Sequence, residues 1–179
     1  MTSSRASAGI GCRWTHQTSG PQKGRTNAGR NPTDRGKLGT KRHILADERG
    51  VPIAVEISGA NVHDVKNALP TIDAIPPRAS KNGNIPKNIC MDKAYDSEAL
   101  REQIRQRGMI PHVRRRGEPP LTVMRKGKPR RWVVERTNSW HNRWRGLLIR
   151  WERKGEHYMA LLMLASILIA FQQTLGALF

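Results

Sequence analysis

The sequence predicts an α/β fold, chiefly because a strand–helix–strand unit lies near the middle of the chain. Ile89–Met91 is a short apolar run of strand length, and Asp92 ends it. Ser97 suits the N-cap of a helix that Gly108 would close, and a second short strand follows at residues 109–113. A strand, a helix and a strand in succession imply parallel strands, which are typical of α/β proteins.

A β-hairpin is predicted before this unit. Lys41–Ala46 alternates loosely and Val51–Ile57 alternates with period two, with Gly50 in the turn between them. Because Pro52 lacks an amide hydrogen, we expect the second strand at a sheet edge. His43 could act in catalysis, but a single histidine on a strand favours a structural or surface role.

Three further helices are expected. One begins at Asp64 and ends before Pro76. Another begins at Arg131, with Gly146 as a possible break. Its apolar face would consist of Trp140, Trp144, Leu147, Leu148 and Trp151. The last, Met159–Phe171, spans about thirteen residues, too few for a membrane, which needs about 20. Its composition predicts burial on nearly all sides or contact with another chain.

The charge of the chain indicates a polyanionic partner. The formal net charge is +18 and the isoelectric point is near 11.3, while 37% of the residues are hydrophobic. Nucleic acid is the first candidate, and a membrane surface is the alternative. Between His112 and Lys154, 14 basic residues stand against 3 acidic ones. Such a concentration favours nucleic-acid contact over a merely solvated loop.

The N-terminal segment has a composition unlike the rest. Residues 1–30 are rich in Ser, Gly, Thr and Arg without apolar periodicity, so we predict a flexible basic arm. Residues 31–175 would form one domain. Cys12 and Cys90 make no disulfide framework, no zinc-site spacing occurs and no signal peptide begins the sequence. These features favour the cytoplasm.

Two acidic residues are candidates for chemistry. Asp92 follows a buried strand, where α/β sheets place their ligands, although on spacing alone a helix-capping role is more ordinary. Glu135 is the only acid between Arg131 and Arg150. It is either a charge partner of Arg131 and Arg136 or a metal ligand held among bases.

Four segments, in order, resemble bacterial insertion-sequence transposases of the DDE type, in the group related to insertion sequence five and with an IS4-like transposase domain. The segments are Asn31–His43 (NPTDRGKLGTKRH), Gly59–Asp64 (GANVHD), Asp92–Ser97 (DKAYDS) and Arg131–Trp140 (RWVVERTNSW). The similarity runs from about residue 31 to residue 173. Several motifs agree in order, which makes the resemblance specific.

The resemblance implies a ribonuclease H-like mixed sheet flanked by helices, with residues 31–175 as the catalytic domain. It also implies metal-dependent cleavage and strand transfer of DNA at insertion-sequence ends. Two Mg²⁺ ions would bind among three carboxylates, and Asp92 and Glu135 match the second and third. Lys93, Arg131 and Arg136 would contact DNA. The implied location is the cytoplasm, at the nucleoid and away from any membrane.

The sequence departs from the family at its first catalytic acid. No Asp or Glu precedes Asp34, and residues 2–6 resemble those that follow the family's first acid. We therefore expect an N-terminally truncated domain that lacks its first central strand and is marginally stable, because two rows of backbone groups would stay unpaired. Its partners would be DNA and an upstream-frame polypeptide or a full-length transposase, in a homo- or hetero-oligomer. The alternative function is an inactive DNA-binding fragment that inhibits transposition or descends from a transposase.

Overall fold

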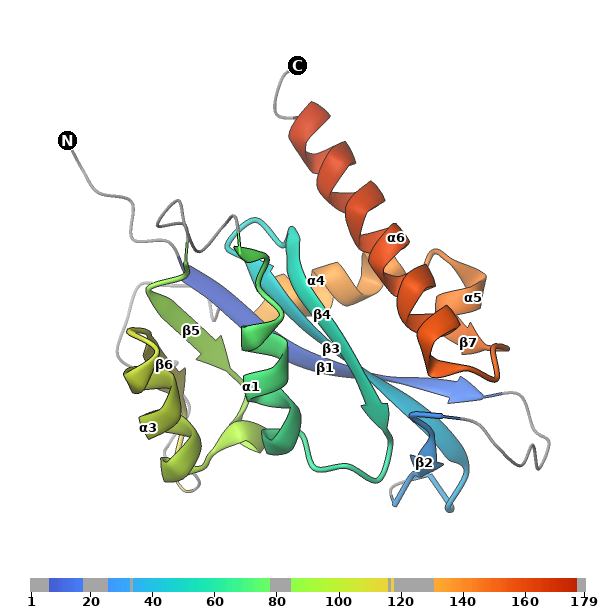
Figure 1. Ribbon diagram of the computed structural model, residues 1–179, viewed down its shortest axis with the longest axis horizontal. Helices are drawn as coiled ribbons and strands as arrows, with labels where there is room; N and C mark the ends of the chain where they lie inside the picture. Colours follow the sequence, from blue (N-terminus) through green and yellow to red (C-terminus); the bar gives the residue numbers. More distant parts are fainter. Residues whose placement is uncertain are drawn as a thin grey trace.

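The computed structural model describes residues 7–17, 26–32, 34–77, 85–115, 117 and 131–176, and for residues 7–17, 131 and 132 it describes the backbone alone. A mixed sheet runs through the molecule with helices on both faces (Figure 1). The strands are β1 (Ser7–Gln17), β2 (Gly29–Arg30), β3 (Leu38–Asp47), β4 (Pro52–Gly59), β5 (Asn88–Met91), β6 (Ile110–Val113) and β7 (Ile149–Arg150). The helices are α1 (Val65–Asp73), η1 (Lys93–Tyr95), α3 (Glu98–Gln106), α4 (Arg131–His141), α5 (Arg145–Leu148) and α6 (Gly155–Leu175).

The strand β1 occupies the centre of the sheet. It pairs antiparallel with β3 and parallel with β5, and β4 and β6 lie outside these two strands. The first strand of the chain thus lies between the hairpin β3–β4 and β5, the strand that precedes Asp92. The ribonuclease H-like resemblance implies this arrangement. The mixed α/β fold class is confirmed. The expected loss of the central strand is wrong, and so is the flexible arm over residues 7–17.

The central strand escaped prediction because its sequence signal is weak. In SAGIGCRWTHQ, Ile10, Cys12 and Trp14 alternate with Gly11, Arg13 and Thr15, but this run is short and two glycines interrupt it. Its place depends on hydrogen bonds to both neighbouring strands, which a single segment does not reveal. The backbone groups of β3 and β5 that were expected to stay unpaired therefore have partners in β1.

The strand–helix–strand unit agrees with the sequence expectation. The Ser97 hydroxyl accepts a hydrogen bond from Leu100 N at 3.4 Å and begins α3. Gly108 takes a φ of +76° after the helix, a conformation that glycine adopts at low cost. β5 and β6 then pair in parallel. Pro52 begins β4, which lies beside β3 at the edge of the sheet as expected.

The region after Arg131 differs from the single long helix that was predicted. α4 ends at His141, and a turn at residues 142–144 separates it from the short α5. Trp144 and Leu147 still pack in the core, but Leu148 and Trp151 are exposed. Gly146 belongs to α5, where an added Cβ would lie 2.9 Å from Leu161 Cδ2, so its small size serves the close approach of α6.

The predicted last helix is longer than expected. α6 has 21 residues, and among the described residues it is the helix whose length and composition would allow it to cross a membrane. Its C-terminal part extends beyond the sheet (Figure 1). Tyr158, Leu162 and Ile169 are buried, while the opposite side of the helix carries exposed apolar residues. The expected burial on nearly all sides is therefore correct for one face only.

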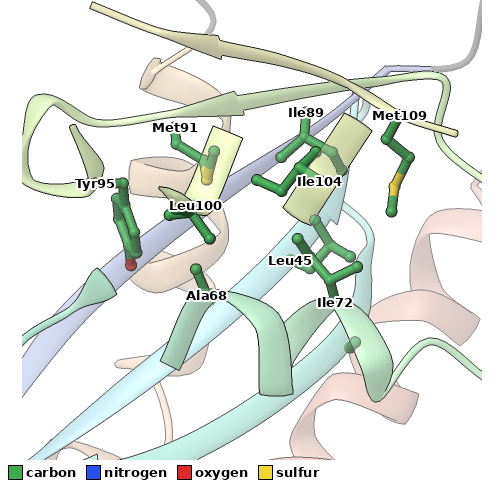
Figure 2. Packing of buried hydrophobic residues seen from close by; sticks show 10 residues of the cluster. Leu45, Ala68, Ile72, Ile89, Met91, Tyr95, Leu100, Ile104 and Met109 are labelled. Carbon is green, nitrogen blue, oxygen red and sulfur yellow. The ribbon is translucent and has the colours of Figure 1, made fainter. Parts of the chain in front are cut away.

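Two apolar clusters lie on opposite faces of the sheet. Leu45 and Ile89 point toward α1 and α3, where they meet Ile72, Leu100 and Ile104 (Figure 2). The neighbouring residue Ile44 points the other way, into a second cluster that includes Leu147, Tyr158, Leu162 and Ala165. The strand alternation thus assigns each residue of β3 to one face.

Candidate functional site

Asp92 lies at the carboxyl end of β5, next to the central strand. Its backbone is extended (φ −69°, ψ 162°), and its carboxylate oxygen Oδ1 accepts a hydrogen bond from Lys93 N at 2.6 Å. The capping role that the spacing suggested is therefore present. Asp92 is half-buried and the side chain of Lys93 is exposed.

The turn after Asp92 is held on two sides. Tyr95 is 1% exposed and packs in the cluster of α1 and α3, beside Leu100 and Met91 (Figure 2). Asp96 forms an ion pair with Arg101 at 2.6 Å, and Arg101 is 6% exposed. An apolar anchor and a well-shielded ion pair fix η1, so the position of Asp92 does not depend on the loop alone.

Glu135 projects from α4, which packs against β1 and β3. Its side chain is exposed, whereas its neighbours Val133, Val134 and Asn138 are buried and Thr137 is fully buried. The two helical turns around Glu135 therefore rest on the sheet and leave the carboxylate accessible.

Two hydrogen bonds join α4 to the turn between β3 and β4. The Thr137 hydroxyl donates to Gly50 O at 2.7 Å, and the Arg136 guanidinium donates to Arg49 O. Gly50 has a φ of +85°, and an added Cβ would lie 3.0 Å from Arg136 Nη2, so both the backbone and the space require glycine. Sequence reasoning identified Gly50 as a turn residue but gave no sign that α4 would dock on it.

A second polar contact holds the end of α4. Arg42 is fully buried on β3 and donates from Nη2 to Asn142 Oδ1 at 2.7 Å. His141 is also fully buried, with Nδ1 2.9 Å from Thr137 O and Nε2 2.9 Å from Ser166 Oγ. A carbonyl only accepts, so Nδ1 carries the proton and Nε2 faces the hydroxyl. Burial lowers the pKa of His141 to about 4, so the ring is neutral at pH 7.

His43 lies on the other face of β3 and has a structural environment. Its Nε2 is 2.8 Å from Ser58 Oγ, and the side chain is fully buried. Burial, opposed by the charge of Asp64 and aided by that of Lys41, lowers the pKa of His43 to about 4. Lys41 and Asp64 themselves form an ion pair at 2.6 Å. The structural interpretation of His43 therefore agrees with its surroundings.

The strand alternation predicts that Asp92 and α4, the helix that carries Glu135, lie toward the same face of the sheet. Ile89 and Met91 point toward α1 and α3, so the alternation of β5 directs Asp92 toward the opposite face. The helix α4 covers that opposite face. Arg42 and Ile44 both point toward this face from β3, and Arg42 contacts Asn142, which follows α4. Both Asp92 and Glu135 thus come from elements that flank β1. Their role as metal ligands stays a prediction.

The predicted DNA contacts have different environments. The side chain of Lys93 is exposed and that of Arg131 lies outside the described residues. Arg136 is partly engaged within the chain, because its guanidinium also lies over the Trp140 ring, 5.0 Å from the ring centroid. The role of all three in DNA binding stays a prediction.

The central strand β1 carries no acid. Ser7–Gln17 contains neither Asp nor Glu, and among the described residues no group of three His, Cys, Asp or Glu side chains is close enough to hold a metal ion. Ile10 pairs with Met91, so Gly11 lies level with Asp92. Gly11 also pairs with Ile44 and shares the face covered by α4.

A known protein family matches most of the chain. Residues 13–170 match the family described as Transposase DDE domain. A putative transposase for insertion sequence element IS402 from Burkholderia cepacia is 42% identical over 151 residues, which cover 83% of this chain and 70% of that protein.

Solved structures also resemble the chain at low identity. The Mos1 transposase paired-end complex with left transposon end has a TM-score of 0.36 and 14% identity, with 59% of this chain and 34% of that chain covered. The Mos1 mariner paired end complex with Mn has a TM-score of 0.37 and 10% identity over 79% and 54%. This chain thus spans about a third to a half of those chains. From the match over residues 13–170 and the IS402 relative, we conclude that the protein belongs to the Transposase DDE domain family.

Proposed function

We propose that this chain acts in DNA transposition as the catalytic domain of an insertion-sequence transposase, binding the ends of the element and its target DNA. The main support is that β5, which ends just before Asp92, and α4, which carries Glu135, both contact the central strand β1. The net charge of +18 suits a DNA partner. The segment Asn31–His43 supports the group related to insertion sequence five, and the proposed location is the bacterial nucleoid.

The family implies dependence on a divalent metal, and we propose Mg²⁺ because carboxylate oxygens are its preferred protein ligands. The residues that the structure describes do not make up the three-carboxylate set. Asp92 and Glu135 supply two carboxylates, and β1 offers Gly11 where a third would complete the set. This described part of the chain therefore does not fit a complete two-metal centre.

It follows that DNA cleavage by this chain alone should be weak. A third carboxylate could come from another polypeptide, such as an upstream-frame product or a full-length transposase, in a hetero-oligomer on DNA. The second candidate function, an inhibitor that occupies DNA ends without cutting them, is favoured by the same acid-free β1.

The test is a nicking assay on supercoiled plasmid that carries the DNA flanking this protein's own gene, with Mg²⁺ or Mn²⁺. Wild-type protein is compared with Gly11→Asp, and Gly9→Asp is the matched control. Gly9 pairs with Cys90 and lies on the same face as Gly11, but farther from Asp92. We expect Gly11→Asp to cleave at least about tenfold faster than wild type, equivalent to roughly 1.4 kcal/mol at the transition state.

The expected gain must depend on the other two carboxylates. Asp92→Asn or Glu135→Gln in the Gly11→Asp background should return cleavage to the wild-type level. If the wild-type chain cleaves the DNA and Asp92→Asn abolishes that cleavage, two carboxylates are sufficient for cleavage. If Gly11→Asp binds the same DNA in a gel shift but does not cleave it, the catalytic assignment is contradicted and the inhibitor function is supported.

Inhibition is measured separately. The wild-type chain is added to an active transposase that acts on the same ends. A loss of excision at concentrations that saturate those ends supports the inhibitor, whereas an unchanged or raised excision rate contradicts it. Because any basic protein binds DNA less tightly as salt rises, salt dependence alone would not separate the two candidates.

A further inference from the structure

A tight turn, Asp34–Lys37, lies between β2 and β3 at one end of the sheet (Figure 1). Lys37 N donates a hydrogen bond to Asp34 O at 2.9 Å and closes the turn. Arg35 and Gly36 have φ values of +49° and +71°, and positive φ at both central residues characterises a type I′ turn. We call this segment the tip turn.

Arg35 is an unusual residue for its position in the tip turn. Asparagine, aspartate or glycine normally stands there, because the left-handed region is unfavourable for larger side chains. The side chain of Arg35 is exposed, and no hydrogen bond or ion pair engages it within the described part of the chain. No contact of the side chain within the fold therefore explains the unfavourable φ. Backbone outliers of this kind are frequent at functional sites.

The base of the tip turn is held firmly. Asn31 is 7% exposed, and its N donates to Lys37 O at 2.8 Å. Nearby, the fully buried Arg150 donates from Nη1 to Asn27 O at 3.2 Å and to Thr40 Oγ1 at 2.6 Å. The tip turn is therefore presented in a fixed geometry, so little conformational entropy is lost when it binds a partner.

Two further cations lie beside Arg35. Arg30 is exposed on β2, and its Nη1 would lie 3.9 Å from a Cβ added to Gly36. The side chain of Lys37 is 57% exposed, and its Nζ lies 3.7 Å from Asp34 Oδ1, which is a weak surface ion pair. Three cations thus stand against one carboxylate, with Arg35 at the tip and the other two at its sides. This balance favours an anionic partner.

The tip turn lies toward the same end of the sheet as Asp92. β5 runs parallel to β1, and the carboxyl end of β1 pairs with the start of β3. Ile44 of β3 pairs with Gly11, which is level with Asp92, and Leu38 begins β3 six residues earlier. At about 3.3 Å per residue, the start of β3 is roughly 20 Å from that level, about the length of six base pairs. One DNA duplex is long enough to reach both places.

We propose that Arg35 enters the minor groove of duplex DNA, while Arg30 and Lys37 contact the phosphates at the two edges of that groove. A two-residue turn is narrow, and it suits the minor groove, about 6 Å wide, better than the major groove, about 12 Å wide. The narrow groove over A·T pairs also has an enhanced negative potential that attracts arginine. The inference rests on the proposed function, because DNA is the partner in both.

The test is fluorescence anisotropy of the nuclease-treated full chain with three duplexes of equal length. One is rich in A·T pairs and one in G·C pairs, and in the third inosine replaces every guanine of the second. Guanine places an amino group in the minor groove, whereas inosine lacks this group and keeps the acceptors of the major groove. Wild type should bind the A·T-rich and inosine duplexes at least about fivefold more tightly than the G·C-rich duplex.

Arg35→Asn is the decisive variant. It removes the guanidinium and supplies the Asn-Gly pair that a type I′ turn prefers. It should weaken binding to the A·T-rich duplex about tenfold and abolish the preference over the G·C-rich duplex. The melting temperature should rise by about 2 °C, because asparagine tolerates a positive φ better than arginine. If Arg35 served only the fold, stability would fall and the preference for A·T pairs would remain.

Two other substitutions separate minor-groove contact from general charge. Lys37→Ala should weaken binding to all three duplexes equally and reduce the salt slope by about one, as expected for a phosphate contact. Lys87→Ala is the charge-matched control, because Lys87 is exposed just before β5, at the opposite end of that strand from Asp92. It should leave all three affinities within about twofold of wild type.

Three results would overturn the proposal. The first is equal binding of the A·T-rich duplex by wild type and Arg35→Asn. The second is an inosine duplex bound no better than the G·C-rich one, because Arg35 would then lie outside the minor groove. The third is double-stranded RNA that competes as well as A·T-rich DNA, since the RNA minor groove is wide and shallow.

The binding measurements are independent of the catalytic assignment. If Gly11→Asp fails to cleave DNA but Arg35→Asn loses the preference for A·T pairs, the catalytic function is contradicted and the minor-groove contact is supported. If Gly11→Asp cleaves DNA and Arg35→Asn binds all three duplexes as wild type does, only the minor-groove contact is overturned.

Discussion

On the face covered by α1 and α3, the sheet is closed by a continuous apolar cluster that includes Leu45 and Ile89. On the face covered by α4, α5 and α6, a smaller apolar cluster is joined by buried polar contacts from Arg42, Thr137 and His141. The first face also holds buried polar contacts, such as that of His43 with Ser58, but on the second face polar contacts join the helix α4 to β3 and its turn.

The difference suggests a division of roles. Apolar packing stabilises without strong directional preference, whereas hydrogen bonds fix both the distance and the orientation of an element. The hydrogen bonds from Thr137 to Gly50 and from Arg42 to Asn142 set the position of α4 on the sheet. The proposed role of Glu135 and Asp92 as metal ligands would require such positioning of α4.

The largest expected effect belongs to the apolar face. Leu45→Ala should lower the free energy of unfolding by about 2–5 kcal/mol, because Leu45 is fully buried and its removal leaves a cavity. Urea denaturation measures the loss. Leu148→Ala, at a residue 45% exposed, is the control and should cost less than about 1 kcal/mol. Similar losses for both variants would contradict the assignment of the core.

A second prediction concerns one buried histidine on each face. The pKa values of His43 and His141 are lowered from 6.5 to about 4, so between those values the unfolded chain binds more protons than the folded chain. Their stabilisation is complete above about pH 6.5 and is lost as the pH falls toward 4, by up to about 3 kcal/mol for each ring. Unfolding free energies measured from pH 7 to pH 4 test this dependence.

The histidine prediction is sharpened by comparing two variants. His43→Gln and His141→Gln should each remove about half of the histidine-dependent slope between pH 6.5 and 4. A slope that neither variant changes would assign the acid sensitivity to carboxylates. A slope that only one variant changes would show that a single face of the sheet senses acid.

The smallest effect on stability is expected at the contact between α4 and the hairpin. Thr137→Val keeps the shape of the side chain but removes its bond to Gly50 O, so it should cost about 1–2 kcal/mol. In the Gly11→Asp background it should also reduce DNA cleavage, because Glu135 loses its positioning, while DNA binding stays unchanged. Thr137→Ser, which keeps the hydroxyl, is the control. Equal cleavage by Thr137→Val and Thr137→Ser would contradict the positioning role.

Local signals account for the parts of the fold that could be predicted. Ser97 and Gly108 mark the ends of α3, and the alternation of residues 51–57 marks β4. The central strand could not be found this way, because β1 is defined by its two neighbours and not by its own residues. The end of α4 at His141 also went unpredicted, since the Trp and Leu spacing continues beyond it.

The candidate site was only partly accessible from sequence. Asp92 was a candidate because it directly follows a strand. The role of Glu135 came from the resemblance, because a single acid among arginines is ordinarily explained as their charge partner. The Thr137–Gly50 bond joins residues 87 positions apart, and no local pattern indicates such a contact. Gly50 needed a positive φ for its turn, which concealed its second role beside Arg136.

The glycine opposite Asp92 has an evolutionary consequence. Every glycine codon becomes an aspartate or glutamate codon by a single base change, so one point mutation at Gly11 would place an acid on the central strand. Because β1 is already built into the sheet, such a mutation would need no accompanying change in the backbone. Under the proposed function, a lineage carrying this gene would be one base change from a third acid beside Asp92.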